Sequence, residues 1–326
     1  MLFLNYAILC ADGIGDALLM MIVAHHLKKL SFSITIFHKS PHVISPLFPS
    51  ATFLPYPPID QFGHVFKNFD HIIFQNDHSK KAFILHNLRT SGALPSCLFL
   101  LITPSKLYRD GDFVFDPKRS LVENVVNATK TLFHLEDATK DNGIINLDSK
   151  EKRQYPKRII LHPTSSDPKR NWKPSQYIRL ASKLKKQGFD PCFVMTKQEK
   201  TSWPISSYEN ISIFVCDNLI ETAKMLHSSG FFIGNDSGIG HLASNLGIPT
   251  LTISGNPKRV RRWRPSFTLN AIVTLSFNLP NFKGLVFRHF DGRFRDKYWH
   301  YFLPVGKVLK RFNHLVETTY NQKDFS

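Results

Sequence analysis

A short glycine-rich turn, residues 234–238, carries side chains and backbone groups suited to binding an anion. Its sequence is Gly-Asn-Asp-Ser-Gly, and it stands between an apolar run at 231–233 and a helical pattern from Ile239 to Leu246. The first N–H groups of a helix are unpaired and lie at the positive end of the helix dipole, so this turn favours a phosphate. A plain crossover in which Asp236 or Ser237 caps the helix fits the same spacing. From these residues alone, both interpretations stay open.

A second segment, residues 162–172, places hydroxyl and cationic side chains between an apolar strand at 158–161 and a helix at 174–187. Its sequence is HPTSSDPKRNW. Short hydroxyl donors together with one mobile cation are apt ligands for phosphate. Thr164, Ser165 and Lys169 are the candidates, and Arg170 is a second candidate for the cation. An ordinary loop between strand and helix is the alternative.

A third candidate lies near the N-terminus, where residues 11–16 form a turn between an apolar strand and a helix at 17–30. Two glycines, Gly13 and Gly15, allow the backbone to approach a ligand. Asp16 stands at the start of the helix, where the dipole favours its anionic form. On these grounds alone, complementing the dipole is the better interpretation of Asp16.

Strand and helix patterns alternate along the chain, and these elements must position the candidate residues. Further strands are expected at 33–37, 52–54, 72–74, 98–102, 193–196, 211–215 and 248–254. This alternation predicts an α/β fold with parallel sheets covered by helices. The chain of 326 residues is long enough for two domains, and the polar segment 136–156 is the expected linker. The predicted domains are therefore 1–150 and 151–303, followed by a C-terminal helix within 304–326.

The net charge of +17 predicts an anionic partner, which is a nucleic acid, an anionic membrane face or a phosphorylated substrate. The sequence lacks the motifs of the common nucleic-acid-binding domains. Its 4 Cys and 15 His are scattered without the spacing of metal ligands, so no metal site is expected. Neither a signal peptide nor a transmembrane helix is expected, because no segment reaches the roughly eighteen uncharged apolar residues needed to span a bilayer.

The segment that contains the first turn, GNDSGIGHLASNLGIPTLTISG, resembles the D-[ST]-G-x-x-H-L-A-[SA]-x-x-G-x-P segment of glycosyltransferase family 9, the heptosyltransferases. The residues that end at Asp16 resemble the G-x-x-G-D segment of this family, and 162–172 resemble its H-x-[TS]-x-x-x-x-K-x-W-P segment. In this chain, one residue more separates Lys169 from Trp172 than in the shortest family versions. The resemblance implies the GT-B fold, two Rossmann-like domains facing across a cleft. It also implies transfer of a heptose from ADP-heptose to the inner core of lipopolysaccharide, by direct displacement with inversion.

The resemblance further implies roles for individual residues. Asp16 is expected to be the general base that takes the proton of the acceptor hydroxyl. Glu221, in the first turn of a helix that Asn218 caps, is expected to bind the ribose hydroxyls, and dipole complementation is its alternative. ADP-heptose is the expected donor, with no metal or other cofactor. The expected donor-site residues are Thr164, Ser165, Lys169, Ser237 and Gly238 for the diphosphate, Asp236 for the sugar hydroxyls, and His241 lining the helix of the turn.

The stretch after Gly255 departs from the family, because five cations follow Asn256 and Pro257. A solvated basic surface and a clamp for phosphates are both open interpretations. The expected partners are a nucleotide sugar and a phosphorylated glycolipid acceptor, with no specific nucleic acid. The expected location is the cytoplasm, peripheral on the anionic face of the inner membrane, and the C-terminal helix is a candidate to pack back on the N-terminal domain. The candidate residues for acceptor phosphate are Arg109, Arg259, Arg261 and Arg262.

Three alternatives remain at this stage. The first is a family 9 enzyme with another nucleotide sugar, because the motifs define phosphate and ribose binding better than sugar binding. The second is a basic nucleic-acid-binding protein, suggested by the charge. The third is an inactive homologue, against which the intact Asp16 argues.

Overall fold

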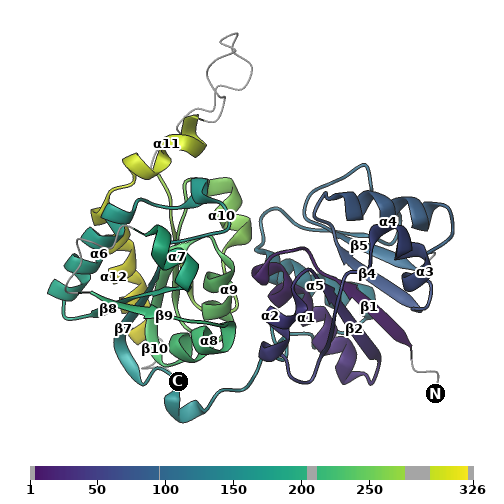
Figure 1. The fold of residues 1–326 in the computed structure, drawn as a ribbon, viewed down its shortest axis with the longest axis horizontal. Helices are drawn as coiled ribbons and strands as arrows, with labels where there is room; N and C mark the ends of the chain where they lie inside the picture. Colours follow the sequence, from purple (N-terminus) through teal and green to yellow (C-terminus); the bar gives the residue numbers. More distant parts are fainter. Residues whose placement is uncertain (1–3, 95, 204–210, 276–293, 322–326) are drawn as a thin grey trace, which may run out of the picture. The chain divides into compact units, whose positions relative to one another are not determined.

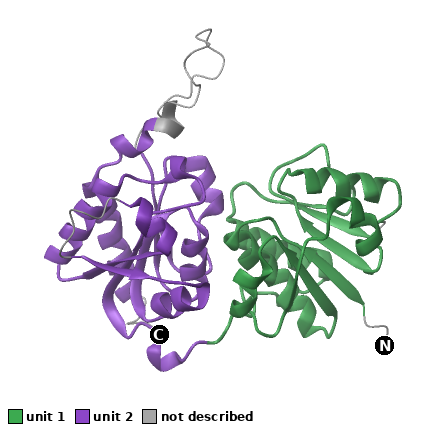
Figure 2. Ribbon diagram, viewed as in Figure 1, with its two compact units in different colours: residues 1–146 green, residues 147–326 purple. Residues whose placement is uncertain are grey.

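The computed structural model describes residues 4–94, 96–203, 211–275 and 294–321. The chain divides into two compact units, Met1–Asn146 and Leu147–Ser326 (Figure 2). Each unit contains one six-stranded sheet in which all strand pairs are parallel (Figure 1). The α/β fold expected from the alternating pattern is therefore confirmed.

The sheet of unit 1 has the strand order β3-β2-β1-β4-β5-β6. Its strands are short and mostly apolar. Apolar strands are typical of a parallel sheet, which is covered by helices on both faces. The last strand, β6, is two residues long and lies at the edge of the sheet. The bounds are β1 Asn5–Leu9, β2 Ser33–His38, β3 Thr52–Pro55, β4 His71–Gln75, β5 Cys97–Leu101 and β6 Phe113–Val114.

The helices of unit 1 differ in how they begin: α1, α2, α3 and α4 have no capping hydrogen bond from a side chain. Helix α5, in contrast, starts with a capping box in which Ser120 and Glu123 exchange hydrogen bonds. Helix α1 buries most of its length and packs against α5. The bounds are α1 Ile14–Lys29, α2 Pro41–Ile44, α3 Phe62–Phe66, α4 Lys80–Thr90 and α5 Leu121–Phe133.

The sheet of unit 2 has the order β12-β11-β10-β7-β8-β9. Its central strand, β10, is buried over its whole length. At Gly234 of β10, a Cβ atom would lie 2.9 Å from the carbonyl oxygen of His162, so the close approach of β7 requires glycine there. The bounds are β7 Tyr155–His162, β8 Asp190–Met195, β9 Ser212–Val215, β10 Ser229–Asn235, β11 Thr250–Ile253 and β12 Asn270–Val273.

The helices of unit 2 include one that the sequence analysis missed, α10, which lies in the basic stretch after Gly255. Asn256 caps it by accepting a hydrogen bond from the backbone N–H of Arg259, and Pro257 takes its first position. The bounds are α6 Pro174–Lys186, α7 Lys197–Ser202, α8 Leu219–His227, α9 Gly238–Asn245, α10 Pro257–Trp263, α11 Phe294–Phe302 and α12 Val305–Asn321.

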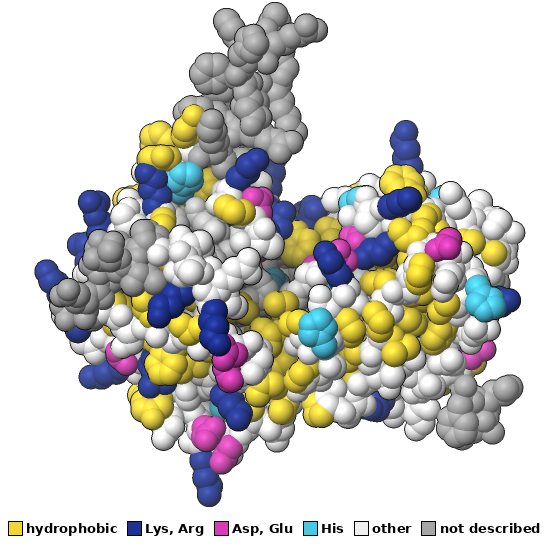
Figure 3. Space-filling model, viewed as in Figure 1, with side chains coloured by type: hydrophobic (Ala, Val, Ile, Leu, Met, Phe, Trp, Pro, Cys, Tyr) yellow, Lys and Arg dark blue, Asp and Glu magenta, His cyan; other side chains and the backbone are white. Residues whose placement is uncertain are grey.

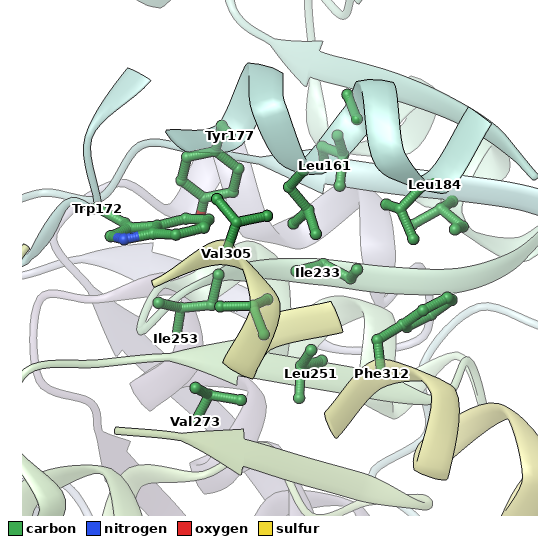
Figure 4. Packing of buried hydrophobic residues seen from close by; sticks show 14 of the residues in the cluster. Leu161, Trp172, Tyr177, Leu184, Ile233, Leu251, Ile253, Val273, Val305 and Phe312 are labelled. Atoms are coloured by element: carbon green, nitrogen blue, oxygen red, sulfur yellow. The ribbon is translucent and has the colours of Figure 1, made fainter. Parts of the chain in front are cut away.

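Helix α12 belongs to the core of unit 2. Its apolar residues, including Val305 and Phe312, are buried with side chains of β7, β10, β11 and α6 in one cluster (Figure 4). Its apolar stripe covers the face of the unit 2 sheet beside α6. The expected packing of this helix on the N-terminal domain stays a prediction.

The polar segment 136–156 is not a free linker over its whole length. Asp141 contacts His25 at 3.0 Å and Lys29 at 3.3 Å, and the amide of Asn142 donates to the carbonyl of Leu18. The carbonyl of Asp148, in contrast, contacts Nε2 of His227 at 3.0 Å in unit 2. The units divide between these attachments, at Asn146 and Leu147.

Candidate functional site

The topology of unit 2 brings two of the three candidate segments to one edge of its sheet. Strands β7 and β10 are neighbours, but the chain leaves β7 toward β8 and leaves β10 toward β11, on opposite sides. In an open parallel sheet, ligands bind beyond the carboxyl ends of the strands where the direction reverses in this way. The segment 162–172 follows β7, and the turn at 236–238 follows β10.

Asn235, which the sequence analysis did not single out, joins the two segments. Its amide nitrogen donates to the carbonyl of Pro163 at 2.5 Å, and its side-chain oxygen accepts the backbone N–H of Trp172 at 3.0 Å. The side chain is 1% exposed, so both of its polar atoms are satisfied inside the protein. Asn235 thus fixes the two ends of the segment after β7 relative to the turn after β10.

Asp236 lies at the centre of a cluster of charges. Its side chain is 7% exposed, and its Oδ2 lies 2.9 Å from Nε of Arg259 and 3.8 Å from Nη1 of Arg170. Arg259 comes from α10 and Arg170 from the segment after β7. A buried carboxylate requires such compensation, because burial disfavours an unpaired charge. The structure therefore places Arg259, a candidate for acceptor phosphate, beside the expected sugar-binding Asp236.

The two neighbouring cations Lys169 and Arg170 have different surroundings. Arg170 is half-buried, donates to the hydroxyl of Ser166 at 2.6 Å and approaches the carbonyl of Asp236 at 3.5 Å. Lys169 is exposed, and its contacts among the described residues involve its backbone. Its N–H donates to Oδ1 of Asp167, and its carbonyl accepts a hydrogen bond from the indole of Trp299. The second candidate for the cation, Arg170, is thus the one that lies at the turn after β10.

Thr164 and Ser165 are both held by polar neighbours. The hydroxyl of Thr164 donates to Oε1 of Glu199, a residue at the start of α7 that the sequence analysis missed. That hydrogen bond helps to lower the pKa of Glu199, although burial opposes the shift. The hydroxyl of Ser165 lies 2.7 Å from Oδ1 of Asn171. The protons of both hydroxyls are therefore engaged within the protein, and Oγ1 of Thr164 also lies 3.4 Å from Nε2 of His162.

Helix α9 begins with the turn that follows β10. Ser237 occupies its N-cap position, but the hydroxyl makes no capping hydrogen bond and is buried without a partner among the described residues. One turn further, His241 is 3% exposed. Burial lowers its pKa, against the opposing effects of Asp236 and of a hydrogen bond to the backbone of Trp263. A neutral His241 and the buried hydroxyl of Ser237 thus lie at the start of α9, together with the backbone N–H groups of Ser237 and Gly238.

Glu221 lies in the first turn of α8, as predicted, and is exposed. Its two oxygens accept hydrogen bonds from the backbone N–H of Asp217 at 2.9 Å and the amide of Asn218 at 3.1 Å. Each carboxylate oxygen has a second lone pair, so these bonds orient the group and leave acceptor capacity.

In unit 1, Asp16 lies at the corresponding reversal of strand direction, between β1 and β4. Gln75, the last residue of β4, donates to Oδ1 of Asp16 at 2.7 Å and accepts the backbone N–H of Ala11 at 3.4 Å. A Cβ atom at position 13 would lie 2.4 Å from Oδ2 of Asp16, so Gly13 is required for this carboxylate position. Gln75 is a positioning residue that the sequence analysis missed.

Three candidates for acceptor phosphate remain, Arg109, Arg261 and Arg262. Arg109 donates to the backbone carbonyl of Arg89, whose own guanidinium forms a fully buried ion pair with Asp112 at 2.6 Å. Arg261 is exposed on α10, and Arg262 is half-buried there. Their proposed contact with acceptor phosphate stays a prediction.

Two features of the described residues concern the predicted absence of a metal site and of a membrane span. These residues contain no group of three or more His, Cys, Asp and Glu side chains arranged to hold a metal ion. None of the helices within the described ranges is long and apolar enough to cross a membrane. The predictions about metal and location stay predictions.

Comparisons with known proteins agree with the resemblance seen in the sequence. Residues 115–284 match the family model of glycosyltransferase family 9 (heptosyltransferase). A search of curated proteins found no significant match. Among solved structures, the chain is similar to a family 9 glycosyltransferase from Veillonella parvula, with 14% identity, coverage of 97% of this chain and 98% of that one, and a TM-score of 0.69.

Two Escherichia coli structures are similar over a comparable length. One is the ADP-heptose lipopolysaccharide heptosyltransferase II, with 13% identity, coverage of 97% and 100%, and a TM-score of 0.66. The other is the heptosyltransferase WaaC with ADP, with 11% identity, coverage of 96% and 100%, and a TM-score of 0.63. At these identities, the likeness establishes the fold.

Proposed function

This chain belongs to glycosyltransferase family 9, the heptosyltransferase family, and we propose that it transfers a heptose from ADP-heptose to an inner-core acceptor of lipopolysaccharide. The observation that carries this proposal is the convergence of Asp236, Arg170, Arg259 and the start of α9 at the reversal between β7 and β10. Two guanidinium groups and the N–H groups of a helix start are suited to a diphosphate.

The proposed reaction is a direct displacement with inversion. The acceptor oxygen forms a bond to the anomeric carbon while the bond from that carbon to the diphosphate oxygen breaks. Asp16 takes the proton of the acceptor hydroxyl, and Gln75 holds its carboxylate in position. ADP departs with the bonding electrons, and the charge that develops on its diphosphate is the charge that the donors of unit 2 stabilise.

In this proposal, Arg170 takes the place that we had expected for Lys169 beside the diphosphate. Thr164, Ser165, Ser237 and Gly238 complete the diphosphate site, Glu221 binds the ribose, and Asp236 binds the sugar hydroxyls. The cations and helix start supply positive charge, so we propose that the reaction needs no metal. The proposed acceptor is a phosphorylated glycolipid at the cytoplasmic face of the inner membrane.

A transfer assay tests this function. The protein is incubated with ADP-heptose and a purified inner-core acceptor that lacks its heptose, in the presence of a chelator. ADP release and the mass of the product are followed, and NMR of the product determines its anomeric configuration. The same assay is run with ADP-glucose and with UDP-glucose in place of ADP-heptose, as comparison donors. Efficient transfer from one of these, with none from ADP-heptose, would redirect the proposal to another nucleotide sugar.

A further inference from the structure

Two helices of unit 2 present cations to solvent with few acids between them. Helix α6 contains Arg179, Lys183, Lys185 and Lys186 and no acidic residue. Helix α12 contains Lys307, Lys310 and Arg311, with Glu317 as its single acid. The two helices are in contact along one face of the sheet. Lys and Arg side chains are visible along the margin of unit 2 where α6 lies, at the left of Figure 3.

The packing of the two helices directs these cations outward. The apolar sides of both helices, with Leu180 and Leu184 on α6 and Val308 and Phe312 on α12, are buried in the core of unit 2. The polar sides must therefore face away from the sheet. Between α6 and the start of α12 lies an open groove of about 520 Å³, and Arg179, Lys183 and Lys186 contribute all of its charged side chains.

The cations of this surface are not neutralised by neighbours. Within the described parts of the chain, Arg179, Lys183 and Lys186 have no carboxylate within ion-pair distance, and neither have Lys310 and Arg311. Mutual repulsion between such groups costs stability unless an anionic surface compensates for it. We define the basic face of unit 2 as Arg179, Lys183, Lys186, Lys310 and Arg311.

Exposed aromatic side chains lie beside one end of the basic face. On α11, which comes just before α12, Tyr301 is 56% exposed and Phe302 is 46% exposed. The ammonium of Lys173, next to the start of α6, lies 3.0 Å from the centre of the Tyr301 ring. The same helix α11 is tied to the candidate diphosphate segment, because the indole of Trp299 donates to the carbonyl of Lys169 at 3.1 Å.

We propose that the basic face, with the aromatic edge on α11, is the surface by which this protein docks on an anionic lipid bilayer. Clustered Lys and Arg are attracted to anionic lipids, and aromatic rings settle at the headgroup level. A single-stranded nucleic acid suits the face less well, because the aromatic rings stand at one end of the cations rather than among them. The choice of a bilayer also rests on the proposed function, which requires a lipid-linked acceptor.

Vesicle flotation of the full chain tests the proposal. Binding is compared between vesicles of phosphatidylcholine alone and vesicles with about 30% phosphatidylglycerol, at a salt concentration near 0.1 M, where screening leaves the attraction measurable. Each cation near such a surface strengthens partitioning about fivefold, so R179Q/K183Q/K186Q should weaken binding about one hundredfold. The control K157Q/K200Q/K224Q removes the same charge from exposed positions on β7, α7 and α8 and should weaken binding much less.

The two triple variants distinguish a docking surface from a general effect of net charge. Equal losses in both variants would mean that net charge alone drives binding, and would overturn the proposal. Tighter binding to duplex or single-stranded DNA than to vesicles near 0.15 M salt, removed by the same three substitutions, would replace the bilayer with a nucleic acid. Transfer to a water-soluble, deacylated acceptor should be unchanged in R179Q/K183Q/K186Q, so failure of the docking surface and failure of the proposed enzyme can be told apart.

Discussion

Replacing Arg170 and Lys169 separately with Gln tests which of two adjacent cations binds the donor diphosphate. The guanidinium of Arg170 is half-buried and lies 3.5 Å from the carbonyl of Asp236, at the start of α9. A hydrogen bond to a charged group contributes about 1.5–3 kcal/mol. R170Q should therefore weaken ADP binding by about tenfold to 150-fold. Lys169 is exposed, and an exposed charge contributes about 0–1 kcal/mol, so K169Q should weaken binding less than about fivefold.

Calorimetric titration with ADP measures both affinities under the same buffer and salt. R261Q is the matched control, because Arg261 is an exposed cation on α10 and its loss changes the net charge equally. R170K retains the charge and should recover part of the affinity, since a Lys cannot reproduce the paired contacts of a guanidinium. A larger loss for K169Q than for R170Q would refute the assignment and return the role to Lys169. Thermal unfolding of each variant shows whether the fold is retained.

Three further predictions concern the base, the ribose and a buried histidine. D16N should lower turnover by about two to four orders of magnitude with ADP affinity unchanged, because the amide keeps the shape but accepts no proton; near-normal turnover would leave Asp16 as a dipole-complementing residue. E221A should weaken ADP binding by about 1–3 kcal/mol, and a wild-type calorimetric affinity would remove Glu221 from the site. The lowered pKa of His241 keeps it neutral in the fold, whereas an unfolded His gains a proton below about pH 6.5. Its contribution to stability is therefore present above that pH and lost as pH falls toward 5. The midpoint of thermal unfolding should fall over this interval, and less steeply in H241N; equal slopes would contradict the buried neutral state.

The sequence predicted the elements around the candidate donor site well, because each had a local signal. The apolar run at 231–233, the glycines of the turn and the stop at Gly247 correspond to β10 and α9 within a few residues. The missed helix α10 also had a signal, since Asn256 followed by Pro257 is a typical helix start. The five cations that follow indicate a solvated basic surface or a phosphate clamp, and neither interpretation specifies a helix.

Other features could not be predicted, because they depend on which distant segments meet. An amphipathic pattern shows that α12 buries one side, but it does not show against which sheet. The pairing of Gln75 with Asp16 joins residues 59 positions apart through the adjacency of β1 and β4. Likewise, the directions of Lys169 and Arg170 follow from a single 3₁₀ turn, Pro168–Arg170, whose orientation no local pattern specifies.

The pairing of Asp236 with two arginines accounts for how a basic site of this kind can be ordered before its ligand arrives. Two guanidinium groups near one helix start would repel each other and sample many rotamers in the absence of an anion. The carboxylate of Asp236, nearly buried, offers one oxygen to both Arg170 and Arg259. It thereby reduces the conformational entropy that a diphosphate would otherwise have to remove on binding. Since one carboxylate cannot neutralise two guanidiniums and a helix dipole, the cluster retains positive charge for the donor.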